Sequence, residues 1–160
     1  MAEVSERIKP FFIRRLKKDV LPDLPDKVYE NRVIVLSPQE KKIYKELASH
    51  GHMATEDEQA VVAIIRCKQF CNWPEMVDSG CQASSKMDAF KEVIHELIVL
   101  NGHKVLVFSQ YKEMLNILGP ELEAMGIKFL RIDGDTKKTR RAEMQKELNE
   151  DATVDAVIGT

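Results

Sequence analysis

The sequence predicts an α/β fold, in which an N-terminal helical segment and a helical insertion precede an incomplete parallel sheet with flanking helices. Strand and helix patterns alternate after residue 103, which is typical of right-handed βαβ units. Residues 37–74 carry two helix patterns and no strand pattern. The chain has 160 residues, about the length of one domain, so it can bury one modest core.

The first 36 residues are expected to form a short amphipathic helix followed by an extended connection. Apolar residues recur there at roughly helical intervals, namely Ile8, Phe11, Phe12, Leu16 and Val20. Pro22 and Pro25 end the helix, because proline lacks a backbone N–H and disfavours helical geometry in the preceding residue. Residues 28–36 look extended and are expected to lead from one structural unit into another.

Two helix-start signals predict the helical pair of residues 37–74. Residues 37–40 (SPQE) combine a capping serine, a proline suited to the first helical position and a glutamate that can reach back. Residues 55–58 (TEDE) repeat the capping pattern, and residues 72–74 (NWP) end the second helix.

The remaining residues predict one more helix and then the sheet. The helix begins at residues 84–88 (SSKMD) and ends at Gly102. Its apolar stripe consists of Met87, Phe90, Ile94, Leu97 and Ile98. Strands are expected at 104–108, 127–132 and 155–158, the first of them buried on both faces because its apolar run is continuous. Helices are expected between the strands, with Gly126 ending the first of them and the second covering residues 137–149. Open sheets usually have about four to six strands, so we expect a fragment or a chain that needs a partner.

Composition and charge favour a soluble intracellular protein. The sequence has no apolar run of about 18 residues and no secretion signal in its first residues. Cys67, Cys71 and Cys81 are an odd number of cysteines, so reduced thiols are expected. The net charge of −2 gives no overall attraction to nucleic acid, and any DNA contact must come from local clusters.

Three loops are expected along one edge of the sheet, where open parallel sheets bind ligands. They are residues 109–111 (SQY), 133–136 (DGDT) and 159–160 (GT). Ser109 and Thr136 each precede a helix, so their hydroxyls and the free backbone N–H groups would suit a phosphate. The alternative is that both hydroxyls merely cap helices.

Four ordered segments of the sequence are informative together: residues 10–20 (PFFIRRLKKDV) with 24–27 (LPDK), 64–74 (IIRCKQFCNWP), 104–111 (KVLVFSQY) and 130–136 (LRIDGDT). They resemble segments of the Swi/Snf family of helicase-like ATPases. Residues 104–111 (KVLVFSQY) are similar to motif IV of that family, and residues 130–136 (LRIDGDT) resemble its next block. Residues 10–20 (PFFIRRLKKDV) with 24–27 (LPDK) are similar to the stretch that joins the two motor lobes. Residues 64–74 (IIRCKQFCNWP) resemble the helical insertion ahead of the second lobe, although Trp73 stands where the family more often has histidine. We expect that this departure alters only the packing.

The resemblance implies a motor of two RecA-like lobes that tracks along double-stranded DNA and binds ATP between the lobes. It divides this chain into an interlobe joint (1–36), a helical insertion (37–83) and the first part of lobe two (84–160). The implied contacts with DNA phosphates are Ser109, Gln110, Gly134 and Thr136. The basic cluster Arg14, Arg15, Lys17 and Lys18 could add contacts, or it could be a solvated helix face.

The sequence lacks the parts that ATP hydrolysis needs. It has no Gly-x-x-x-x-Gly-Lys-Ser/Thr loop and no Asp-Glu pair after an apolar strand. The family's motif V would begin at residues 157–160, and motif VI with its arginine finger would follow. We therefore expect no catalytic, cofactor-binding or metal-binding residue in this chain, and ATP and magnesium are implied only for the complete motor. The implied partners are DNA, bound weakly through its backbone, and lobe one, but no membrane.

Three further alternatives concern zinc, function and location. His50, His52, Cys67 and Cys71 do not have zinc-finger spacing, so we expect thiols without zinc. A non-enzymatic protein-interaction module that uses the helical pair is the alternative function. The short insertion suits a bacterial or viral member, which would be cytoplasmic, whereas a eukaryotic one would be nuclear.

Overall fold

The computed structural model describes residues 7, 11–13, 15–21, 23–52, 57–78, 80–81 and 83–160. The chain forms two compact units, Met1–Val33 and Ile34–Thr160. In the first unit the helix α2 (Lys17–Val20) is only 4 residues long. The described residues from 28 to 33 are exposed and belong to neither helix nor strand, as expected of a connecting segment.

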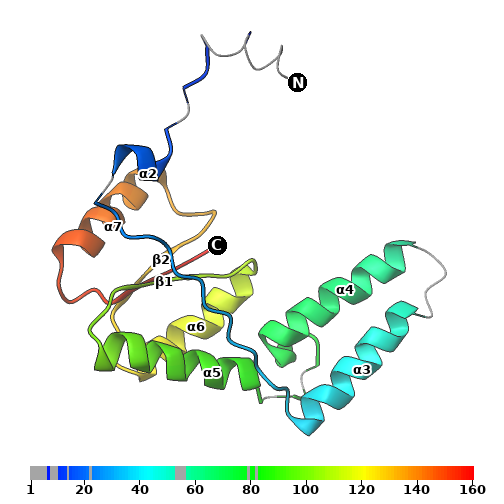
Figure 1. The fold of residues 1–160 in the computed structure, drawn as a ribbon. Helices are drawn as coiled ribbons and strands as arrows, with labels where there is room; N and C mark the ends of the chain where they lie inside the picture. The colour runs from blue at the N-terminus through cyan, green and yellow to red at the C-terminus, as the bar shows by residue number, and fades with distance from the viewer. Residues whose placement is uncertain are drawn as a thin grey trace. The chain divides into compact units, whose positions relative to one another are not determined.

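The second unit begins with the predicted helical pair, α3 (Pro38–His52) and α4 (Asp57–Asn72) (Figure 1). The predicted capping box forms at the start of α3. Ser37 N–H donates to Glu40 Oε2 at 2.7 Å, and Glu40 N–H donates to Ser37 Oγ at 3.2 Å. Thr55 and Glu56 of the second predicted capping pattern lie outside the described residues.

Glu40 also ties the helical pair to α5 (Ser85–Ile94). Its Oε1 accepts from the Ser85 N–H at 2.9 Å, and its Oε2 accepts from the Ser85 hydroxyl. Glu40 is only 2% exposed. Burial alone would raise the pKa of Glu40, but the hydrogen bonds from Ser85 and Ser37 outweigh it and lower that pKa. One carboxylate therefore serves the starts of two helices.

The helix α5 begins within the predicted residues 84–88, and Ser84 caps it. Ser84 Oγ accepts from the Met87 N–H at 3.2 Å. The chain continues as a π-helix (His95–Leu100), and Gly102 follows with φ of 67°. The buried members of the predicted stripe are Met87, Ile94 and Ile98.

The three strands form a parallel sheet in the order β1-β3-β2. They are β1 (Val105–Phe108), β2 (Phe129–Ile132) and β3 (Ala156–Gly159). The central strand β3 is buried at every position. The prediction that β1 is buried on both faces is wrong, because β1 is an edge strand with Leu106 55% and Phe108 74% exposed. A continuous apolar run does not distinguish a central strand from this edge strand.

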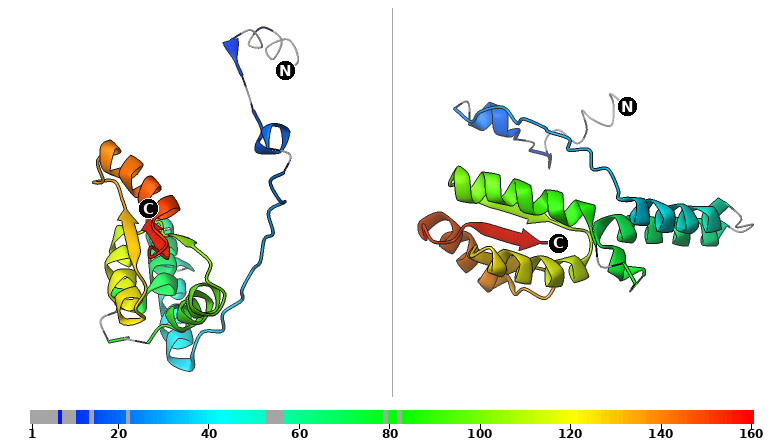
Figure 2. Two further views of the ribbon diagram at one scale, coloured as in Figure 1. Left: turned by 90° about the vertical axis from the view of Figure 1, so that its left-hand side faces the viewer. Right: turned by 90° about the horizontal axis from the view of Figure 1, so that it is seen from below.

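Helices cover both faces of the sheet. On one face, α5 and α6 (Lys112–Ala124) pack against the strands, and Ala156 and Ile158 join their core. On the other face, α7 (Lys138–Glu150) packs against β2, and its residue Met144 is buried. Figure 2 shows β3, in red, between these helices. Gly126, with φ of 73°, ends α6 as predicted. The predicted α/β fold class is thus confirmed.

Candidate nucleic-acid interface

The carboxyl ends of the three strands meet at one edge of the sheet, as the sequence predicts. Ser109 N–H donates to Gly159 O at 3.0 Å, and Thr160 N–H donates to Ile132 O at 3.2 Å. The strand ladder therefore extends beyond the strand ends. It places the β1–α6 loop and the β2–α7 loop on either side of the end of β3, where an open parallel sheet binds its ligands.

The β1–α6 loop presents Ser109 and Gln110. Ser109 is half-buried, and its Oγ accepts from the Tyr111 N–H at 3.2 Å, while Gln110 is exposed. The residue that precedes α6 is Tyr111, which makes no side-chain cap. Ser109 therefore shapes a turn and keeps its hydroxyl proton available for an acceptor outside the loop.

The β2–α7 loop is folded around the buried side chain of Asp133. The Asp133 N–H donates to Thr136 Oγ1 at 3.0 Å, and Thr136 Oγ1 donates to Asp133 Oδ1 at 3.3 Å. The Asp135 N–H donates to the same Oδ1 at 3.1 Å. Lys137 precedes α7 and makes no side-chain cap. The alternative that Ser109 and Thr136 merely cap helices is therefore wrong, and the Thr136 hydroxyl holds the loop.

Two arginines brace this loop, and sequence reasoning missed both. Arg131 Nε donates to Asp133 Oδ2 at 3.2 Å, and its Nη1 donates to Asn116 Oδ1 at 2.7 Å. Arg141 donates through Nη2 to Asp133 O at 2.9 Å and through Nε to Thr136 O at 3.0 Å. Burial would raise the pKa of Asp133, but the Asp135 N–H and Arg131 outweigh it and lower that pKa.

An ion pair between Lys112 and Asp135 links the start of α6 to the β2–α7 loop. The hydrogen bond to Asp135 raises the pKa of Lys112. Between the bracing groups the backbone of Gly134 stays open, since an added Cβ would meet no atom within 4 Å. The edge thus combines prearranged loops with an accessible stretch of backbone.

The structure brings together four of the eight predicted contact residues: Ser109, Gln110, Gly134 and Thr136. The other four belong to the first unit, Met1–Val33. Arg14 lies outside the described residues, and Arg15 is exposed. Lys17 and Lys18 begin α2, and their side chains are likewise outside the described part of the chain.

Two family models match this chain along almost its whole length. The SNF2-related domain matches residues 1–76, and the helicase conserved C-terminal domain matches residues 85–160. The chain belongs to the Swi/Snf family. Among the described residues, no helix of this Swi/Snf chain is long and apolar enough to cross a lipid bilayer.

A relative from Schizosaccharomyces pombe shows how much of a Swi/Snf protein the chain corresponds to. The SWI/SNF chromatin-remodeling complex subunit snf22 is 30% identical over 164 residues, which cover 89% of this chain and 10% of that protein. The chain therefore spans about a tenth of the length of this relative.

Solved structures show the same fold. The Sulfolobus solfataricus SWI2/SNF2 ATPase core domain matches with a TM-score of 0.75 and 23% identity, covering 99% of this chain and 36% of that one. The same core in complex with dsDNA matches with a TM-score of 0.73 and 23% identity, again covering 99% of this chain and 36% of that one. The chain has the fold of part of a RecA-like Swi/Snf core.

Proposed function

We propose that this chain supplies backbone contacts to double-stranded DNA in the second lobe of an ATP-dependent DNA translocase. The observation that carries the proposal is the pair of prearranged loops at the carboxyl edge of the sheet. Ser109 offers a hydroxyl proton and Gly134 an open backbone within this edge. Membership of the Swi/Snf family and the dsDNA complex of the Sulfolobus core support the same function.

The contact residues have different roles in this proposal. Ser109, Gln110 and Gly134 contact phosphates, whereas Thr136 holds the β2–α7 loop in shape. Arg14, Arg15, Lys17 and Lys18 form a second contact region within the interlobe joint. The division into joint (1–36), helical insertion (37–83) and first part of lobe two (84–160) belongs to the same proposal.

ATP and magnesium act in the complete two-lobe motor, of which lobe one is the partner. The acidic groups at the edge do not fit a magnesium site in this chain. Asp133 is bound by Arg131, and Asp135 pairs with Lys112. We therefore assign no nucleotide contact to these residues.

Binding of a fluorescent duplex at several salt concentrations tests the proposal. We expect weak binding without base preference, whose salt slope corresponds to about two to four phosphates, because each contact contributes about 0.9 to that slope. A strong preference for one base sequence would contradict the proposal. Absence of any salt-sensitive binding would favour the protein-interaction module instead.

A further inference from the structure

A cavity of about 840 Å³ lies between the helical pair and the β1–α6 loop. One wall carries the thiols of Cys67 and Cys71, both on α4. Other walls carry the aromatic rings of Tyr44, Phe108 and Tyr111. The cavity therefore joins two soft nucleophiles to an aromatic lining.

Cys67 and Cys71 are neighbours in space. They stand four residues apart on one helix, and residues at that spacing lie on the same face with Cβ atoms roughly 5–6 Å apart. Both thiols are free and half-buried. Burial raises the pKa of the Cys71 thiol, and the nearby Cys67 raises it further. The two sulfurs are thus close enough to interact, and the raised pKa keeps the Cys71 thiol protonated at neutral pH.

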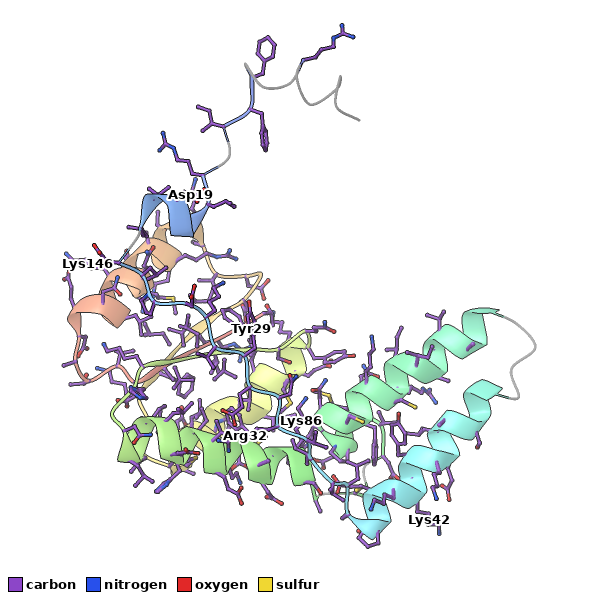
Figure 3. The ribbon with its side chains drawn as sticks, in the orientation of Figure 1. Asp19, Tyr29, Arg32, Lys42, Lys86 and Lys146 are labelled. Atoms are coloured by element: carbon purple, nitrogen blue, oxygen red, sulfur yellow. The ribbon has the colours of Figure 1, made fainter. Side chains whose placement is uncertain are left out.

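Cys67 and Cys71 provide two soft ligands, and the side chains of His50 and His52 lie outside the described part of the chain. Among the described residues, no group of three or more His, Cys, Asp or Glu side chains could hold a metal ion. A closed zinc site needs four protein ligands. Two thiols can instead bind a soft, three-coordinate atom whose third bond is to an apolar substituent. Lys86, which is labelled in Figure 3, lines the cavity. Its Nζ donates to Oδ1 of Asn72, the last residue of α4, at 2.5 Å.

We propose that Cys67 and Cys71 form a dithiol site for a trivalent thiophilic centre with an apolar substituent, the class to which aryl arsenic(III) compounds belong. Two As–S bonds form as the arsenic–oxygen bond of the ligand breaks. The oxygen leaves as water with both thiol protons, and arsenic remains trivalent. The aryl group lies in the cavity among Tyr44, Phe108 and Tyr111. The inference does not depend on DNA binding by the chain.

Phenylarsine oxide tests the proposal on the full 160-residue chain. Mass spectrometry is expected to show one phenylarsenic group in place of two hydrogens, and peptide mapping to place it on residues 67 and 71. The adduct should survive a monothiol and be removed by a dithiol. Cys67→Ser and Cys71→Ser should each lower the apparent affinity about 100-fold or more, because the second bond of a chelate forms within one molecule.

Cys81→Ser is the matched control. Cys81 is buried, and its Sγ lies 3.7 Å from Ala83 O, to which it donates. This variant should bind the arsenical like the parent. Parent-like affinity in either single variant at residue 67 or 71 would overturn the proposal. Mapping of the adduct to Cys81 would overturn it as well, and because mapping uses the parent protein, it does not depend on how a variant folds.

Discussion

At the scale of single residues, Gly134 allows DNA binding to be tested separately from folding. Gly134→Ala should leave the free energy of unfolding almost unchanged, since the added methyl meets no atom within 4 Å and the residue is not in the left-handed region. The methyl would obstruct a phosphate at the backbone. We expect DNA affinity to fall about tenfold, the equivalent of about 1.4 kcal/mol, in a fluorescence anisotropy titration.

The same exchange in the connection between α4 and α5 provides the control. Gly80→Ala adds a methyl near only the flexible end of Asp78, at 3.2 Å, and should bind DNA like the parent. Equal DNA affinity of the Gly134 variant and the Gly80 variant would argue against a phosphate at this loop.

Arg141 offers a second residue test, because its neighbour Arg140 has the same charge and different partners. Arg141 donates to the carbonyls of Asp133 and Thr136, whereas Arg140 pairs with Glu143 and Glu147. Arg141→Ala should weaken DNA binding about tenfold and Arg140→Ala by much less. In the double variant, Arg141→Ala should add little to the loss of DNA affinity caused by Gly134→Ala, since the free-energy effects of two changes in one loop are not additive. Additive losses would mean that Arg141 contacts DNA independently.

The sequence predicts where this site lies better than it predicts what each group does. Ser109 and Thr136 follow strand patterns, so their meeting at one edge follows from parallel topology. The role of the Thr136 hydroxyl depends on the burial of Asp133, which sequence spacing does not reveal. A buried aspartate before Gly-x-Thr could have been suspected, since aspartate often bonds to backbone N–H groups two residues on. The bracing by Arg141 needs a long side chain to reach back from the next helix.

At the scale of elements, the carboxylate of Glu40 connects the helical pair α3 and α4 to α5. Glu40→Ala leaves the Ser37 and Ser85 N–H groups without this acceptor. We expect a loss of about 2–3 kcal/mol of stability, because hydrogen bonds to charged groups contribute about 1.5–3 kcal/mol. The melting temperature should then fall by roughly 4–12 °C, as measured by circular dichroism.

The pH dependence of Glu40→Gln provides a sharper check of that junction. The pKa of Glu40 is lowered from 4.5 in the folded chain. The carboxylate therefore contributes its full stabilisation above pH 4.5 and loses it as the pH falls through the lowered value. The stability difference between parent and Glu40→Gln should shrink under acid in urea titrations.

Helix starts were the most predictable elements, because caps are local. The Ser37–Glu40 box and the Ser84 cap depend on residues three positions apart. The edge position of β1 depends on strand order, and strand order is set by contacts far apart in the sequence. The π-helix His95–Leu100 likewise could not be predicted, because no capping residue or proline marks its start.

At the scale of the whole molecule, the chain should show no DNA-stimulated ATP hydrolysis. Its sequence has no phosphate-cradling lysine loop, and its acidic groups at the sheet edge are paired with Arg131 and Lys112. Loss of single transition-state contacts in such motors costs about 10³–10⁵ in rate. A coupled phosphate-release assay should therefore match a buffer blank. A longer protein with lobe one and motifs V and VI should hydrolyse ATP.

Clear turnover by the 160-residue chain, once contaminating ATPases are excluded, would contradict this expectation. Adding Gly134→Ala to the longer protein provides the internal comparison. Hydrolysis without DNA should persist there, while its stimulation by DNA should weaken.

The strand order β1-β3-β2 also has a consequence in time. β1 and β2 do not pair with each other, and each waits for β3, which is synthesised after both. About 50 residues separate β1 from β3, so at roughly 5–20 residues per second a ribosome needs on the order of 3–10 s to supply the missing strand. During that interval the apolar strand β1 of the nascent chain has no backbone partner from β3. A chaperone that binds unpaired strands can bind it then.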